Sequence, residues 1–364
     1  MEANGNNRYV YLVSKGLYLD AVNYSKNNQI CVEINVTMPI LKNNQSEKLY
    51  NSSTPTVSVI MNCLNCEKYL REAIDSVFAQ TYEDWEIIFW EDNASKDGSE
   101  NIARSYGRKL RYFRSDVSLP LYGSRNLAVQ EARGKYIAIL DCDDLWLPTK
   151  LEEQIQLLES DEEIGLVYSD IISFSEKGKE RRSFEFKKPH RGNVFSELLF
   201  ENFINTQTVL IRKEAFDSLN TPFDGRLIMS GDYDAFLRIS YKWEIDYVDK
   251  PLARYRVHRN SKSWRDGRKL VTVEIDLMMD NLRKAVNEFD KNYPEEIRHL
   301  KRRRDVQLSL LDWENGDRKN ARTRLHFYVR DGISYLTLYL LTYLSYRYFF
   351  YPFYRLYTKN LMAD

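Results

Sequence analysis

The chain has 364 residues, of which 43% are hydrophobic, enough for one large domain with an accessory region. Lysine plus arginine and aspartate plus glutamate both number 53, so the formal net charge is zero. A balanced charge gives no general attraction for nucleic acid, and we expect no nucleic-acid partner.

The four cysteines are few and unevenly placed. Cys63 and Cys66 form a Cys-x-x-Cys pair, but no second pair or nearby histidine accompanies it. The pair is therefore weak evidence for zinc or redox chemistry, and reduced thiols are expected. The first residues lack the charged-then-apolar pattern of a secretory signal, which favours a cytoplasmic protein.

Residues 1–55 precede the regular alternation of strands and helices. Stretches 9–13 and 30–36 resemble strands around a helical stretch at 17–25, and a polar linker follows. We treat 1–55 as an extension of unknown role.

From Val57 onward, apolar strands alternate with amphipathic helices, which predicts an α/β fold with a mostly parallel sheet and helices on both faces. Beyond Asp266 the pattern is all-helical. We therefore expect a domain at 56–265 and a helical region at 266–364. The predicted strands cover 57–61, 85–90, 110–114, 136–140, 165–174, 206–211 and 245–258, with a charged loop at 177–191. The predicted helices cover 67–80, 98–106, 124–132, 194–201, 270–289, 295–313 and 318–328, with others starting at Pro148 in the N1 position and near Gly231.

The strand at 136–140 ends in three acids within four positions, Asp141, Asp143 and Asp144. Clustered carboxylates repel one another, and a bound divalent cation removes that cost. Open α/β sheets also bind ligands at this edge of the sheet. A solvated acidic turn or a helix-capping cluster has the same spacing, so the spacing alone leaves both interpretations open.

Polar residues also follow two other predicted strands, at 62–65 and 91–93. The carboxyl ends of parallel strands share one edge, where a nucleotide can lie across the sheet. No Gly-x-Gly-x-x-Gly motif and no P-loop motif is present, so the phosphates need another partner. Mg²⁺ or Mn²⁺ held by Asp141 and Asp143 fits that need.

Five motifs in this order and spacing resemble family-2 glycosyltransferases, over about residues 56–260. They are Val57-Ser-Val-Ile, Asp92-Asn-Ala-Ser-Lys-Asp-Gly-Ser, Gly123-Ser-Arg-Asn, Asp141-Cys-Asp-Asp and Gly231-Asp-Tyr-Asp. The resemblance implies a GT-A fold and an inverting, Mn²⁺- or Mg²⁺-dependent transfer from a nucleotide-diphosphate sugar, with a UDP-sugar favoured. It also implies a glycan or lipid-linked acceptor in surface polysaccharide synthesis.

By the same resemblance, Asp92 would accept a hydrogen bond from the nucleotide base, and Arg125 would lie near the diphosphate or the donor sugar. Asp141 would contact the ribose or the metal, and Asp143 would ligate the metal. Two alternatives stay open from the residues alone. Arg125 could form a surface salt bridge on its helix, and Asp92 could cap the helix that follows.

The resemblance assigns the general base for the acceptor hydroxyl to Asp232. The acid that usually precedes this aspartate is Gly231 here, which removes a second carboxylate. The alternative is that Asp232 caps the predicted helix and that Asp234 only decorates its first turn.

Two other matches concern donor binding. The motif that usually follows the first strand is Asn62-Cys63-Leu64-Asn65 here, so Leu64 replaces an aromatic residue that often stacks on the base. His258 matches a position that often carries a histidine near the diphosphate, although a lone histidine is equally consistent with a structural role.

Near the carboxyl end, residues 333–346 carry no charge, but this run is too short to span a membrane. A tyrosine-rich segment follows at 348–354, and basic residues precede it at 301–304. Aromatic faces suit the headgroup boundary, and basic residues suit anionic lipid. We expect a peripheral contact with the inner face of the membrane; a core or dimer helix is the alternative.

Two other functions remain as alternatives. A sugar nucleotidyltransferase can have a similar sheet and metal carboxylates, but it usually needs a glycine-rich, basic phosphate loop that residues 62–67 lack. A non-catalytic protein that binds a nucleotide sugar or acts as a membrane scaffold is the other.

Overall fold

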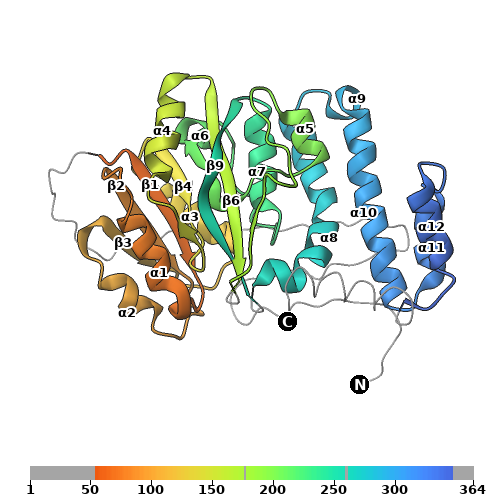
Figure 1. Cartoon of the computed structure of the whole chain (residues 1–364), viewed down its shortest axis with the longest axis horizontal. Coiled ribbons are helices and arrows are strands. Elements are labelled where there is room, and N and C mark those ends of the chain that lie inside the picture. The colour runs from red at the N-terminus through yellow and green to blue at the C-terminus, as the bar shows by residue number, and fades with distance from the viewer. Residues whose placement is uncertain (1–53, 176–177, 259–260, 347–364) are drawn as a thin grey trace. The chain divides into compact units, whose positions relative to one another are not determined.

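The computed structural model describes residues 54–175, 178–258 and 261–346, without the side chains of 262–271 and 273. The predicted elements before residue 54 and the tyrosine-rich segment at 348–354 lie outside this range. Figure 1 shows a central sheet with helices around it and further helices toward the carboxyl end.

The sheet has nine strands in the order β3-β2-β1-β4-β8-β6-β9-β5, with β7 paired to β6. The first four positions of this order form a parallel block, as the alternating pattern predicts. Their strands are β1 (Val57–Cys63), β2 (Trp85–Glu91), β3 (Leu110–Arg114) and β4 (Tyr136–Ile139). Consequently β1, β2 and β4 end at one common edge of the sheet.

The other half of the sheet is mixed. A long parallel ladder joins β6 (Ile164–Ser175) to β9 (Glu244–Val257), so most paired residues of the sheet lie in parallel ladders. The antiparallel pairings are short. They involve β5 (Leu145–Trp146), β7 (Glu180–Arg182) and β8 (Leu210–Arg212).

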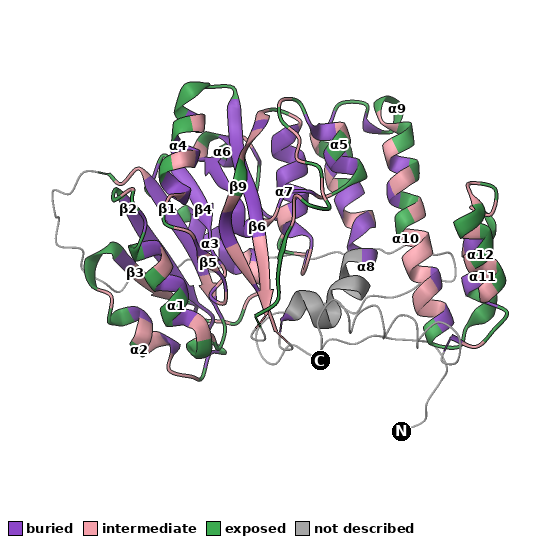
Figure 2. Ribbon diagram, viewed as in Figure 1, coloured by how far each residue is buried: buried purple, intermediate pink, exposed green. Residues whose placement is uncertain are grey.

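Helices cover both faces, because alternate strand residues enter two different cores. Val59 belongs to one buried cluster and its neighbour Ile60 to the other. One face is covered by α1 (Glu67–Phe78), α2 (Ser99–Arg104) and α4 (Lys150–Ser160). The opposite face is covered by α3 (Leu121–Gln130), α5 (Phe195–Phe200), α6 (Lys213–Asp217) and α7 (Gly231–Ser240). Figure 2 shows the buried strands between these layers.

The carboxyl-terminal helices continue the second core. Met278 and Leu282 of α8 and Leu300 of α10 lie in the same buried cluster as the inward residues of α7. A small separate cluster contains Trp313, Ala321 and Tyr346. The helices are α8 (Lys262–Ala285), α9 (Phe289–Asn292), α10 (Pro294–Glu314), α11 (Arg318–His326) and α12 (Ile333–Leu341).

Some local predictions differ from the structure. The helix predicted to start at Pro148 begins at Lys150, so Pro148 is not its N1 residue. The predicted strand at 206–211 begins with the 3-10 turn Thr206–Thr208, because the Asn205 side chain accepts a hydrogen bond from the Gln207 N–H and caps that turn. The very short strands β5 and β7 and the helix α6 were not predicted, since partners distant in the sequence define these strands.

Candidate active site at the carboxyl edge of the sheet

Asp141 lies directly beyond β4, and both of its carboxylate oxygens have a partner. Arg125 Nη2 donates to Oδ1 at 2.8 Å, and Gln207 Nε2 donates to Oδ2 at 2.6 Å. The Asp141 N–H in turn donates to Gln207 Oε1 at 2.8 Å. Two elements distant in the sequence therefore fix this carboxylate, which still has 38% of its side-chain surface exposed.

One alternative placed Arg125 in a salt bridge on the surface of its helix. The structure instead buries this residue. Its side chain is 2% exposed, and its guanidinium lies 5.6 Å from the Tyr122 ring centroid and 5.8 Å from that of Phe223. Its Nε has no hydrogen-bond partner among the described residues. A buried guanidinium with an unsatisfied N–H suits an anionic ligand beside Asp141.

His258, the residue directly after β9, lies against Asp143. Its Nε2 is 2.9 Å from Asp143 Oδ2, and its ring centroid is 5.2 Å from that of Tyr69. Partial burial of the carboxyl group and the nearby charge of Asp141 raise the pKa of Asp143. The charge of Asp141 thus raises the cost of ionising Asp143, which is the electrostatic situation that a bound cation relieves.

Asp144, the third acid, differs from the other two. It is fully buried, and its Oδ1 accepts the Arg256 N–H at 2.7 Å. Burial raises the pKa of Asp144 well above its usual value, which favours the protonated form. Arg256 Nε also donates to the Asp143 carbonyl at 2.9 Å. The contact between β9 and residues 141–144, here called the acidic turn, is therefore structural.

Asp232 lies in the first turn of α7. Its Oδ1 accepts from the Tyr233 N–H at 2.8 Å and from the Tyr122 hydroxyl at 3.2 Å, and Thr206 Oγ1 donates to its Oδ2. The helix N-cap is Ser230, so Asp232 does not occupy the capping position. Its carboxylate is oriented by donors from three separate elements.

The sequence did not identify the neighbours Thr206 and Gln207 as site residues. They connect the Asp232 side of the candidate site to the Asp141 side. Thr206 binds Asp232, and Gln207 binds Asp141. Both lie in the 3-10 turn that was predicted as strand. The available signal was a polar Asn-Thr-Gln-Thr run immediately before an apolar strand.

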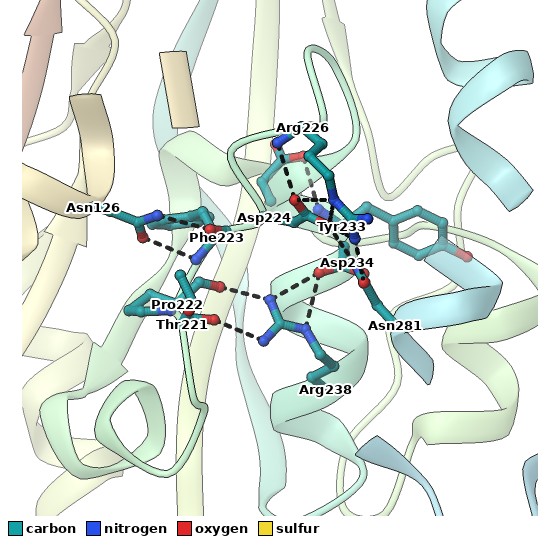
Figure 3. Close-up of polar contacts among 11 residues, drawn as sticks. Asn126, Thr221, Pro222, Phe223, Asp224, Arg226, Tyr233, Asp234, Arg238 and Asn281 are labelled. Carbon is teal, nitrogen blue, oxygen red and sulfur yellow. Dashed lines mark hydrogen bonds and ion pairs between the residues drawn. The ribbon is translucent and has the colours of Figure 1, made fainter. Parts of the chain in front are cut away.

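A buried polar network around Asp234, two residues after Asp232, fixes α7 (Figure 3). Asp234 is fully buried and accepts from Arg238 Nε at 2.9 Å and from Asn281 Nδ2 at 3.1 Å. Arg238 also donates to the carbonyls of Thr221 and Pro222 at 2.8 and 2.7 Å. Asp234 is therefore an anchor of the helix rather than a surface residue of its first turn.

The loop before α7 is held by Glu274 of α8. Its Oε1 accepts from Ile228 N–H at 2.7 Å, its Oε2 accepts from Ser230 N–H at 2.8 Å, and the Met229 N–H lies 3.1 Å from both oxygens. The carboxylate is nearly buried. One side chain of the helical region thus satisfies three backbone donors next to Asp232.

The residues that were predicted to bind the nucleotide lie at the ends of β1 and β2 and form a second group. Asp92 accepts from the backbone N–H groups of Ala94 and Leu119 at 2.8 and 3.0 Å, so it shapes its own loop and does not cap α2. Asn65 has a left-handed φ of 56° and binds the Lys96 N–H at 2.8 Å. The Asn62 amide is buried without a partner among the described residues, and Leu64 is exposed.

The donor set at the acidic turn suits a hard divalent cation. Asp141 and Asp143 supply two carboxylates, and no third His, Cys, Asp or Glu in the described ranges converges with them on one point. Mg²⁺ and Mn²⁺ are commonly held by one or two carboxylates, with substrate phosphates and waters completing the shell. The residues present therefore fit such an ion together with a diphosphate.

We predict that Glu274→Gln lowers the free energy of unfolding by about 1–3 kcal/mol, because an NH₂ group, which cannot accept a hydrogen bond, replaces one of the two oxygens that accept from the backbone. Urea unfolding followed by circular dichroism measures the change. The exposed Glu185→Gln is the matched control and should change stability by less than about 0.5 kcal/mol. Equal stability of the two variants would contradict the anchoring role of Glu274.

Solved structures share this fold at low sequence identity. A mannosyltransferase from Pyrobaculum calidifontis, solved with GDP-Man and Mn²⁺, aligns over 86% of this chain and 89% of its own, with a TM-score of 0.55 and 17% identity. TarS from S. aureus, solved with UDP-GlcNAc, aligns over 80% of this chain and 91% of its own, with a TM-score of 0.52 and 16% identity. The predicted GT-A fold is confirmed.

Sequence comparisons give the family. Residues 58–219 match the model of glycosyl transferase family 2. An uncharacterized glycosyltransferase of Methanocaldococcus jannaschii is 33% identical over 208 residues, which cover 56% of this chain and 71% of the relative. One from Rickettsia felis is 30% identical over 227 residues, which cover 60% of this chain but only 37% of the relative. The chain therefore belongs to glycosyl transferase family 2 and is a glycosyltransferase.

Proposed function

We propose that the protein transfers a sugar, with inversion, from a nucleotide-diphosphate sugar to a hydroxyl of a glycan or lipid-linked acceptor. The observation that carries the proposal is the polar connection between Asp232 and Asp141 through Thr206 and Gln207. It supports a donor-binding acid and a proton-accepting acid in one site. We further propose that residues 56–265 form the catalytic domain.

In this mechanism Asp232 is the general base. The acceptor hydroxyl gives its proton to the Asp232 carboxylate, and its oxygen forms a bond to the anomeric carbon of the donor. The bond from that carbon to the diphosphate oxygen breaks on the opposite face, and the nucleoside diphosphate leaves. Tyr122 and Thr206 hold the carboxylate in position, which lowers the cost of orienting the base during the reaction.

The donor would lie across the ends of β1, β2 and β4. We assign Asp143 and Asp141 to the divalent cation, Arg125 and His258 to the diphosphate, and Asp92, Asn62, Leu64 and Asn65 to the nucleoside. Mn²⁺ or Mg²⁺ would neutralise the charge that develops on the leaving group. The bound molecules of the two structural neighbours, GDP-Man with Mn²⁺ and UDP-GlcNAc, support a nucleotide sugar, and we favour a UDP-sugar.

Replacing the proposed base tests the mechanism. Asp232→Asn should lower kcat by about 10²–10⁴-fold, because the amide cannot accept the proton. Transfer of radiolabelled sugar from a panel of nucleotide sugars measures the rate, and Asp217→Asn, an exposed carboxylate of α6, is the control. Near-full activity of Asp232→Asn would overturn the base assignment. Release of pyrophosphate from a nucleoside triphosphate would favour a nucleotidyltransferase, and binding without turnover would favour a scaffold.

The cation assignment makes a separate prediction. UDP together with Mn²⁺ should raise the thermal unfolding midpoint of the wild type more than UDP alone does, since a ligand stabilises only the fold that binds it. Asp143→Asn should abolish that increment and leave the midpoint of the ligand-free protein within a few degrees of the wild type. An unchanged Mn²⁺ increment in this variant would remove Asp143 from the metal site.

We also propose a peripheral contact with the inner face of the membrane, as expected for an enzyme of surface polysaccharide synthesis. No helix in the described part of the chain is long and apolar enough to cross a bilayer. Helix α12 exposes Ile333 and Leu340, at 78% and 55%. Of the basic run at 301–304, Arg302 and Arg304 lie in ion pairs with Asp331 and Asp305 at 3.5 and 3.0 Å, which reduces the charge this run offers to lipid.

The membrane contact predicts a difference between two charge insertions on α12. Leu340→Asp should reduce co-flotation with anionic phospholipid vesicles at least several-fold, because it places a charge on the exposed apolar face. Ser334→Asp, which adds the same charge at an exposed polar position of the helix, should have a smaller effect. Equal flotation of the wild type and Leu340→Asp would contradict the contact, and a dimer lost only in Leu340→Asp would favour a dimer helix.

A further inference from the structure

Three cysteines from separate parts of the sequence meet beside the candidate active site. Cys63 is the last residue of β1, Cys66 directly precedes α1, and Cys142 lies between Asp141 and Asp143. Their sulfur atoms all lie within 4.8 Å of one another. In the described ranges this is the only set of three or more His, Cys, Asp or Glu residues close enough to share one metal ion.

The backbone between Cys63 and Cys66 brings two of the sulfurs together. Asn65 adopts the left-handed conformation, with φ 56°, which turns the chain back toward the end of β1. The Leu64 N–H donates to Cys66 Sγ at 3.2 Å, so the turn already provides a hydrogen bond to sulfur. The Cys-x-x-Cys spacing is that of structural zinc sites.

The third sulfur comes from the acidic turn. The Cys142 thiol donates to the Asn62 carbonyl at 3.3 Å, which joins this turn to the end of β1. Cys63 and Cys142 are buried, and Cys66 is partly exposed. The cluster therefore has two enclosed ligands and one that opens toward solvent, where a water can complete the coordination shell.

We propose that Cys63, Cys66 and Cys142 together bind one Zn²⁺ ion as thiolates. A Zn–S distance of about 2.3 Å places the sulfurs of one tetrahedral ion about 3.8 Å apart, which is within the span of this cluster. Each thiol loses one proton as its Zn–S bond forms, so binding releases up to three protons and needs no oxidant. A disulfide would use only two of the three sulfurs, and its formation would require an oxidant.

This site is chemically distinct from the carboxylate site next to it. Thiolates select zinc, whereas the carboxylates of Asp141 and Asp143 suit Mg²⁺ or Mn²⁺. Because Cys142 lies between these two acids, zinc would connect the acidic turn to the loop that precedes α1. The ion would restrain the donor-binding edge without taking part in the reaction. The proposal does not depend on the transfer chemistry.

Cobalt substitution tests the proposal on the full chain. The reduced, chelator-stripped protein is titrated with Co²⁺, whose thiolate complexes absorb by sulfur-to-metal charge transfer. We expect one equivalent of Co²⁺ to saturate this absorption and Zn²⁺ to abolish it by displacement. Cys63→Ser and Cys142→Ser should lose the absorption. Cys31→Ser, which changes the fourth cysteine of the chain, and Asp143→Asn should retain it.

The unfolding midpoint provides a second measurement, and circular dichroism shows that each variant compared is folded. Zn²⁺ should raise the midpoint of the wild type and of Cys31→Ser, but not that of Cys142→Ser, whose circular dichroism must match the wild type. Absence of thiolate charge transfer in the reduced wild type, or its persistence in Cys142→Ser, would overturn the proposal. So would a Zn²⁺-induced rise of the midpoint that is equal in all variants.

Discussion

Two consecutive side chains, those of Thr206 and Gln207, connect the two carboxylates on which the proposed reaction depends. Thr206 and Gln207 bind Asp232 and Asp141, so a single 3-10 turn sets the position of the proposed base relative to the proposed donor site. The turn can do this because it immediately precedes β8, which is paired to β4, the strand that ends in the acids. A shift of β8 in register would move both carboxylate contacts together. The antiparallel pairing of these short strands is therefore part of the geometry of the candidate active site.

The acids at this edge of the sheet fall into two classes, which burial separates. Asp144 and Asp234 are fully buried, and burial raises the pKa of each. Their partners are a backbone N–H for Asp144 and the Arg238–Asn281 pair for Asp234. Asp141 and Asp143 keep more than a third of their side-chain surface exposed. All four residues are aspartates of the two acidic motifs, but only the exposed ones can contact a substrate or an ion.

The periodicity of the sequence predicted the parallel block, the helices on both faces and, among the carboxyl-terminal helices, α8, α10 and α11. These elements are long, and their burial is repeated at each turn or alternate residue. It did not predict β5, β7 or the turn at Thr206, because contacts with distant residues define them. Asp143 and Asp232 were predicted as site residues from motifs. Gln207 and Glu274 carry no local motif; their importance lies in hydrogen bonds across 66 and at least 44 residues of chain.

The Glu274 contact changes where this molecule could be divided. Sequence periodicity places a boundary near residue 265, yet a fragment ending there would lack the acceptor for three backbone N–H groups beside Asp232 and would expose the apolar face that α8 covers. The α/β segment therefore depends on the helical region for these hydrogen bonds and for the cover of one apolar face. Recombination between relatives that exchanged only the α/β segment would separate the loop before α7 from the residue that shapes it, so the two segments are expected to be inherited together.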